Sequence, residues 1–129
     1  MSDSAKVRSY PLSPMQQGML FHALSNPASG VDVEQIVCRL NEVLDPQRFT
    51  QAWQQVVDRH DILRTRLAWV GEKEPQQVVE SGWALQVAIE DWSSDAAEDQ
   101  EDKLKRFLAA DRTQGFELDK LPLMRVSLF

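Results

Sequence analysis

The sequence predicts a single α/β domain in which helices pack against β-strands around one core. Apolar residues recur at helical spacing in three segments, alternate with polar residues in several shorter ones, and are separated by turns that contain Gly or Pro. The chain has 129 residues, enough for one core, and its 43% hydrophobic and 26% charged residues are ordinary for a folded domain.

The first helix is predicted to begin at Ser13. Residues 1–9 before it are polar and are expected to be disordered. Ser13 is a favourable N-cap, Pro14 suits the first helical position, and Gln16 stands where a capping-box partner would reach back to the Ser13 amide. The helix should end near Leu24. Most of its apolar residues are expected to face a core, namely Met15, Met19, Leu20 and Ala23.

A strand and a second helix are expected next. Residues 31–40 alternate in character and are rich in β-branched side chains, which favours a strand with burial on both faces in its second half. Asp45 is placed to cap the second helix and Pro46 to open it. One continuous apolar stripe runs along this helix and consists of Phe49, Ala52, Trp53, Val56, Val57 and His60.

An antiparallel hairpin is predicted in the middle of the chain. Its strands are residues 63–69 and 76–80, and residues 71–75 form the turn between them. A further strand is expected over residues 85–89. These short runs supply most of the predicted β-structure.

A third helix and a final strand complete the prediction. The helix should span roughly Asp95 to Asp111, and residues 124–129 are apolar enough to form a buried strand. Because domain boundaries usually fall in exposed polar segments, a core strand at this position leads us to expect a longer parent domain. The inward side of the helix is predicted to carry Ala97, Gln100, Leu104, Phe107, Leu108 and Asp111.

Charge and cysteine content exclude several classes of function. The formal net charge is −6, so no broad basic surface is available for nucleic acid, and the six carboxylates from Asp91 to Asp102 fit a solvated helix face. No apolar run approaches the ~20 residues that a membrane span needs, and the amino terminus lacks a signal-peptide core. The single Cys38 can form no internal disulfide and has no zinc-ligand spacing around it, which favours a reducing cytoplasm without a bound metal.

Two histidines are the obvious candidates for general-base catalysis. His22 and His60 each lie on or beside an apolar helical stripe, and neither has an evident orienting partner nearby in sequence. We therefore expect packing or capping roles for both. Nucleophilic triads and glycine-rich phosphate loops are absent from the sequence.

Three segments of the chain form an ordered set of motifs. They are YPLSPMQQGMLFH at residues 10–22, RHDILRTRL at residues 59–67, and GFEL followed by LPLMR within residues 115–125. In this order they resemble the opening of nonribosomal peptide synthetase condensation domains. The first is similar to that family's Ser-x-x-Gln helix start, and the second to its Arg-His-Glu-x-Leu-Arg-Thr-x-Phe motif. The third is similar to the passage that precedes the catalytic motif. Asp61, Leu67 and Glu117 stand where the family commonly has Glu, Phe and Asp.

This resemblance implies a fold and an activity. The fold would be part of the amino-terminal lobe of a chloramphenicol-acetyltransferase-like domain, with helices on a mixed sheet. The parent activity would be amide bond formation between carrier-protein-bound thioesters, through a His-His-x-x-x-Asp-Gly motif. This motif is absent here, so we expect residues 10–129 to be the part of the domain that precedes it. We expect no catalytic residue in this chain and no activity from the chain alone.

The resemblance also suggests supporting residues. In the family, an arginine of the second motif holds the motif aspartate, and Arg59 and Arg64 both flank a helix-to-strand junction where a guanidinium could bind a carboxylate bidentately. The sequence leaves the choice between them open. Ser13 and Gln16 are explained by capping and Met19 by core packing, yet all three could line the channel of the phosphopantetheine arm.

Several alternatives remain open from the sequence. The expected partners are peptidyl carrier proteins, which bring phosphopantetheine so that the chain binds no cofactor directly, together with adjacent synthetase domains and the remainder of the domain. A non-catalytic carrier-protein docking module with the same fold is the alternative, and an epimerisation or cyclisation relative is a third. Apolar surface left uncovered should also make the isolated chain self-associate.

Overall fold

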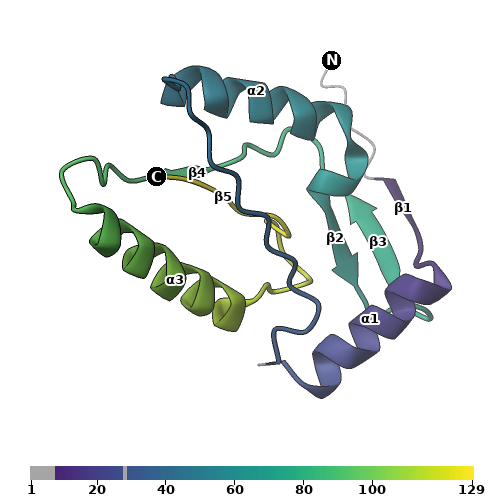
Figure 1. The fold of residues 1–129 in the computed structure, drawn as a ribbon. Helices are drawn as coiled ribbons and strands as arrows, with labels where there is room; N and C mark the ends of the chain where they lie inside the picture. The colour runs from purple at the N-terminus through teal and green to yellow at the C-terminus, as the bar shows by residue number, and fades with distance from the viewer. Residues whose placement is uncertain (1–7, 28) are drawn as a thin grey trace, which may run out of the picture.

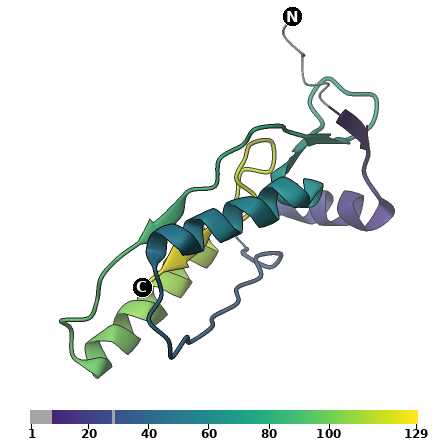
Figure 2. The same ribbon diagram turned by 90° about the horizontal axis from the view of Figure 1, so that it is seen from above.

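Helices and strands are both present in the computed structural model, which describes residues 8–27 and 29–129 (Figure 1). Within these described residues, three α-helices and two small sheets confirm the predicted α/β class. The antiparallel sheet and α1 lie toward one end of an elongated molecule, and α3 lies toward the other (Figure 2).

The antiparallel sheet has three strands in the order β1-β3-β2. They are β1 (Arg8–Pro11), β2 (Thr65–Ala68) and β3 (Gln76–Val79), and the β2–β3 register pairs Thr65 with Val79. The predicted hairpin is thus confirmed. Strand β1 was not predicted, because a polar segment that ends in Pro11 has no strand pattern, although an edge strand tolerates proline.

The second sheet is a single parallel pair. Its strands are β4 (Val87–Ile89) and β5 (Val126–Leu128), so the two strands expected near residues 85–89 and 124–129 both form. Parallel and antiparallel pairing therefore occur in two separate small sheets.

Helix α1 (Pro14–Ser25) begins with the predicted capping box. The Ser13 hydroxyl accepts the Gln16 amide at 3.2 Å, and the Gln16 side-chain oxygen accepts the Ser13 amide at 2.8 Å. The expectation that most of its apolar residues face a core was wrong, because only Leu20 is buried and Met15 is 78% exposed. Among the described residues, few elements pack against the rest of this helix.

Helix α2 (Pro46–Arg59) also follows its sequence signals. Asp45 caps it by accepting the amides of Gln47 and Arg48, and Val57 is fully buried. The predicted stripe is only partly covered, because Ala52 and Val56 are exposed and His60 is an exposed residue at the helix end. A helical period identifies an apolar face, but the neighbouring elements decide how much of that face is buried.

Two further elements follow α2. A single 3₁₀ turn, η1 (Asp61–Arg64), links it to β2, and helix α3 (Ala97–Gln114) occupies the region predicted for the third helix. Near α3, Phe107 packs on Phe129, which in turn stacks on Trp92 with ring centroids 4.1 Å apart. This aromatic cluster joins α3 to the end of the parallel pair.

Residues 31–40 form no strand, so that prediction was wrong. This unpaired segment crosses from the end of α1 to the start of α2 without entering either sheet (Figure 1). Val33 is buried, whereas Ile36 is 89% exposed and Leu40 is 56% exposed. A segment with high strand propensity forms a strand only when a neighbouring strand pairs with its backbone. No described segment pairs with residues 31–40 in this way.

The predicted disordered segment, residues 1–9, overlaps the described chain only at its end. Arg8 and Ser9 belong to β1, and residues 1–7 lie outside the described residues. In the described part of the chain, no helix combines the length and apolar character needed to cross a membrane.

The buried side chain of Val57 gives a direct test of the core. Replacing Val57 by Ala should lower the free energy of unfolding by about 2 kcal/mol, because buried methyl groups are lost and a cavity remains. The matched variant Val43→Ala removes the same groups from a fully exposed position and should have no measurable effect. Urea unfolding followed by circular dichroism measures both. Equal effects of the two substitutions would contradict this core assignment.

Candidate functional site

The second motif forms a charged cluster at the junction between α2 and β2. Asp61 accepts the Arg64 guanidinium at one carboxylate oxygen and the Arg8 guanidinium at the other. Arg64 also donates to the Glu80 carbonyl at 2.8 Å, and its side chain is only 15% exposed. Arg66 pairs with the Glu80 carboxylate at 2.7 Å. The largely buried guanidinium of Arg64 is therefore fixed from two directions.

Arg59 has a different environment from Arg64. It lies in the last turn of α2, is exposed, and forms no ion pair with the other described residues. The two arginines that the sequence left equivalent are thus distinguished by burial and by partners. Within the described chain, the Arg64 guanidinium pairs with the Asp61 carboxylate.

The first motif is joined to the antiparallel sheet by a pair of amide side chains. Gln16 donates to the Gln77 side-chain oxygen at 3.2 Å, and Gln77 donates to the Pro11 carbonyl at 3.1 Å. Gln77 is buried, so these bonds satisfy a polar group that would otherwise be costly to bury. Gln16 consequently caps its own helix and also anchors that helix to β3.

The third motif is organised around Arg125 and Asp111. The Arg125 side chain donates to the Asp111 carboxylate at 2.7 Å and to the Gly115 carbonyl at 2.6 Å, and it stacks over the Phe116 ring. Gln35 donates to the same carboxylate at 2.9 Å. This network fastens the end of α3, the third motif and the unpaired segment to one another.

Asp111 is ionised more readily than an ordinary aspartate. Its partial burial would raise the pKa, but hydrogen bonds from Gln35 and Arg125 and the positive charges of Arg125 and Arg112 outweigh burial, so the pKa lies below its ordinary value. The carboxylate thus stays charged near neutral pH. Arg112 also donates to the Val33 carbonyl at 2.8 Å.

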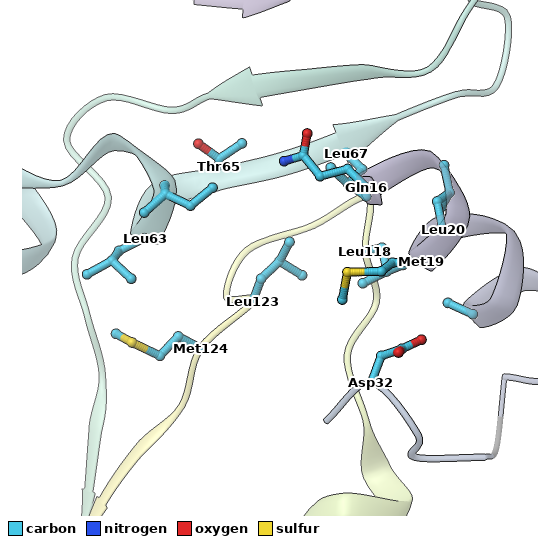
Figure 3. A pocket seen from close by; sticks show the side chains of 12 residues that line it. Gln16, Met19, Leu20, Asp32, Leu63, Thr65, Leu67, Leu118, Leu123 and Met124 are labelled. Atoms are coloured by element: carbon cyan, nitrogen blue, oxygen red, sulfur yellow. The ribbon is translucent and has the colours of Figure 1, made fainter. Parts of the chain in front are cut away.

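One cavity of about 360 Å³ collects residues from all three motifs (Figure 3). Gln16 and Thr65 lie on one side of it and Asp32 on the other, with leucine and methionine side chains between them. The first motif contributes Gln16, Met19 and Leu20; the second Ile62, Leu63, Thr65 and Leu67; the third Leu118, Leu123 and Met124. A backbone bond from the Leu67 amide to the Leu118 carbonyl, 2.8 Å long, holds the second and third motifs together.

The predicted site residues are therefore only partly brought together. Gln16 and Met19 line the cavity, whereas Ser13 does not, and Arg64 lies at the charged cluster instead. Asp32 was not predicted to belong to a site, because an acid in an apparent strand carries no motif of its own. Asp111 was predicted only as part of a helical stripe, and its partners Gln35 and Arg125 are too distant in sequence to signal the network.

Neither histidine occupies a catalytic arrangement in the described structure. His22 and His60 are both exposed, and their hydrogen bonds within the described chain involve only backbone atoms at helix ends. Among residues 8–27 and 29–129, no group of three or more His, Cys, Asp and Glu residues could hold a metal ion. Cys38 is exposed and free.

Comparison with known proteins identifies the family. A family profile described as "Condensation domain" matches residues 6–129. A linear gramicidin synthase of Brevibacillus parabrevis is 47% identical over 120 residues, which are 93% of this chain and 2% of that protein. A plipastatin synthase of Bacillus subtilis (strain 168) is 40% identical over 134 residues, covering all of this chain and 5% of that protein.

The fold is similar to a solved relative. The crystal structure of the starter condensation domain of rhizomide synthetase RzmA matches with a TM-score of 0.75 and 22% identity, over 94% of this chain and 30% of that one. The chain belongs to the condensation domain family, and the predicted resemblance is confirmed. It spans only a small part of the length of the synthetases that it matches.

The Asp111 network gives a pH-dependent prediction. Because the folded-state pKa is lowered, the Asp111 carboxylate stabilises the fold above its ordinary pKa, and this contribution is lost as pH falls through the lower folded-state value. Asp111→Asn should cost about 1–3 kcal/mol at pH 7 and flatten the loss of stability below about pH 5. Thermal unfolding at a series of pH values measures this. Asp102→Asn, on the exposed part of α3, should follow the wild-type curve.

Proposed function

We propose that residues 10–129 form the amino-terminal part of a condensation domain that joins two carrier-protein-bound acyl groups through an amide bond. The observation that carries the proposal is the meeting of three family motifs, far apart in sequence, around one cavity. In the reaction, an amine nitrogen attacks a thioester carbonyl. A C–N bond forms, the C–S bond breaks, and the amine proton is passed on as the thiol leaves.

In this proposal, the chain contributes residues that line the cavity and residues that support the active site, and it does not contribute the general base. Its two histidines are exposed at helix ends, so the proton would be taken by the histidine motif in a part of the domain outside this chain. A chain that covers 30% of a solved condensation domain is consistent with such a division. We therefore propose that this chain alone is inactive.

The cavity is the proposed route for the phosphopantetheine arm of a carrier protein. Its volume falls in the usual range for small-molecule sites, and its lining is mainly apolar with a few polar groups. Gln16 and Met19 are the channel-lining residues in this proposal. Ser13 serves the channel only indirectly, because its hydroxyl starts the helix that presents both side chains.

Arg64 is the proposed partner of the aspartate in the histidine motif. It is largely buried and held by its bonds to Asp61 and Glu80, whereas Arg59 is exposed and makes no ion pair with another described residue. A guanidinium fixed in this way can bind a further carboxylate in a defined orientation. Of the two arginines between which the sequence left the choice open, we therefore propose Arg64.

The proposed setting is a cytoplasmic peptide synthetase. A single exposed thiol is compatible with a reducing compartment, and the net charge of −6 disfavours nucleic acid as a partner. The proposed partners are peptidyl carrier proteins, adjacent synthetase domains and the rest of the condensation domain.

Substitution of the two arginines tests this function. In the synthetase that contains this chain, Arg64→Ala should slow amide bond formation between loaded carrier proteins by about tenfold or more, as expected when an orienting contact is lost. Arg59→Ala is the matched control and should leave the rate within about twofold. Product is followed by mass spectrometry. The isolated chain should give no product, and turnover by it would contradict the proposed division of roles.

We also propose that the isolated chain self-associates through its uncovered apolar surface. The unpaired segment presents Ile36 and Leu40 to solvent, and an exposed apolar patch favours association with another chain. Sedimentation at micromolar concentration should give species heavier than the 14.7 kDa monomer, and Ile36→Lys with Leu40→Lys should shift them toward monomer. Val70→Lys, also exposed but outside the segment, should not. A clean wild-type monomer would count against this proposal.

A further inference from the structure

The Asp61 carboxylate occupies a central position in the charged cluster of the second motif. One oxygen accepts the Arg64 guanidinium from the same 3₁₀ turn, and the other accepts the Arg8 guanidinium from β1. Asp61 is itself about one-third exposed, whereas the Arg64 side chain is only 15% exposed. The acid thus lies between solvent and a largely buried cation.

The backbone around Asp61 is held in place from both ends of the turn. In a 3₁₀ turn, residues i and i+3 lie directly above each other, which brings Asp61 beside Arg64. The hydroxyl of Thr65, a buried residue, donates to the Asp61 carbonyl at 2.7 Å. The carboxylate therefore projects from a fixed position, and it can impose an orientation on the longer and more mobile arginine side chain.

Arg64 is in addition tied to the neighbouring strand. Its carbonyl accepts the Glu80 amide at 2.9 Å, and its guanidinium donates to the Glu80 carbonyl at 2.8 Å. A guanidinium has five N–H donors, and the bonds to Asp61 and Glu80 use two of them. Donors therefore remain for one more acceptor.

The charges of the cluster favour such an acceptor. Three guanidiniums, from Arg8, Arg64 and Arg66, face two carboxylates, from Asp61 and Glu80, which leaves one positive charge uncompensated. The pair between Arg8 and Asp61 is exposed and contributes little by itself. The partly buried contact between Asp61 and Arg64 is the one that can fix geometry.

We propose that Asp61 is a positioning residue, which holds the Arg64 guanidinium so that its remaining donors are presented to a third carboxylate. The proposal rests on the support role proposed for Arg64, and it adds the group that sets the orientation of that arginine. A glutamate should serve the same purpose, because it keeps the carboxylate within reach of the turn. An asparagine should not, because the charge is lost.

Nitrogen NMR of the arginine side chains tests the orientation without any activity measurement. In the wild-type chain, both terminal nitrogens of Arg64 donate hydrogen bonds, which should slow the rotation of its guanidinium group and give a separate signal for each nitrogen. Exposed Arg59 should give averaged signals. Asp61→Asn should average the Arg64 signals, and Asp61→Glu should restore their separation. Asp102→Asn, at an exposed position of α3, should leave them unchanged.

Two outcomes of this measurement would overturn the proposal. One is averaged Arg64 signals in the wild-type chain, a result that decides the matter even if Asp61→Asn fails to fold. The other is separate Arg64 signals in a folded Asp61→Asn variant. Backbone amide spectra show whether each variant is folded.

A second arm separates this proposal from the support role of Arg64. In the synthetase that contains this chain, Asp61→Asn should lower kcat by about tenfold with little change in KM for the carrier protein, and Asp61→Glu should recover most of it. If Arg64→Ala has no effect on the rate while the NMR result holds, the support role fails, whereas the orientation of Arg64 by Asp61 stands. If Arg64→Ala lowers the rate of amide bond formation but Asp61→Asn changes neither that rate nor the Arg64 signals, the positioning role fails.

Discussion

The ion pair between Arg125 and Asp111 is the contact that anchors the third motif to the last turn of α3, and the same carboxylate also holds the unpaired segment through Gln35. Arg112 adds a bond from α3 to the Val33 carbonyl. That segment has no strand to pair with among the described residues. These side-chain hydrogen bonds therefore hold it in place instead of backbone hydrogen bonds to a strand. The position of β5, and with it the parallel pair, depends on the same anchor.

A different constraint governs the other end of the molecule. Gln16 links the start of α1 to the buried Gln77 of β3, and the Leu67 amide links β2 to Leu118. These bonds bring the three family motifs around one cavity, although each motif belongs to a different element. In the described structure, the motif residues cap a helix, anchor that helix to the sheet and join two motifs through hydrogen bonds.

The parts of the fold that local physics controls were predictable from the sequence. Ser13 and Asp45 mark the helix starts because an N-cap satisfies amides within its own first turn. The hairpin followed from alternation around a short turn. The strand predicted over residues 31–40 failed because a strand exists only when another segment accepts its hydrogen bonds. Strand β1 was missed for the converse reason, since its partner β3 imposes an extended form on a polar segment.

For the site, the sequence by itself determined the family and the order of its motifs, because those depend on residue types and spacing alone. It reduced the supporting arginine to two candidates and proposed three lining residues. Only the tertiary structure distinguished largely buried Arg64 from exposed Arg59 and placed Gln16 and Met19, but not Ser13, at the cavity. The physical reason is that burial and hydrogen-bond partners are properties of packed neighbours. Glu80, which accepts from Arg64, is 16 residues away from it, and Arg8, which shares Asp61 with Arg64, is 53 residues away from that aspartate.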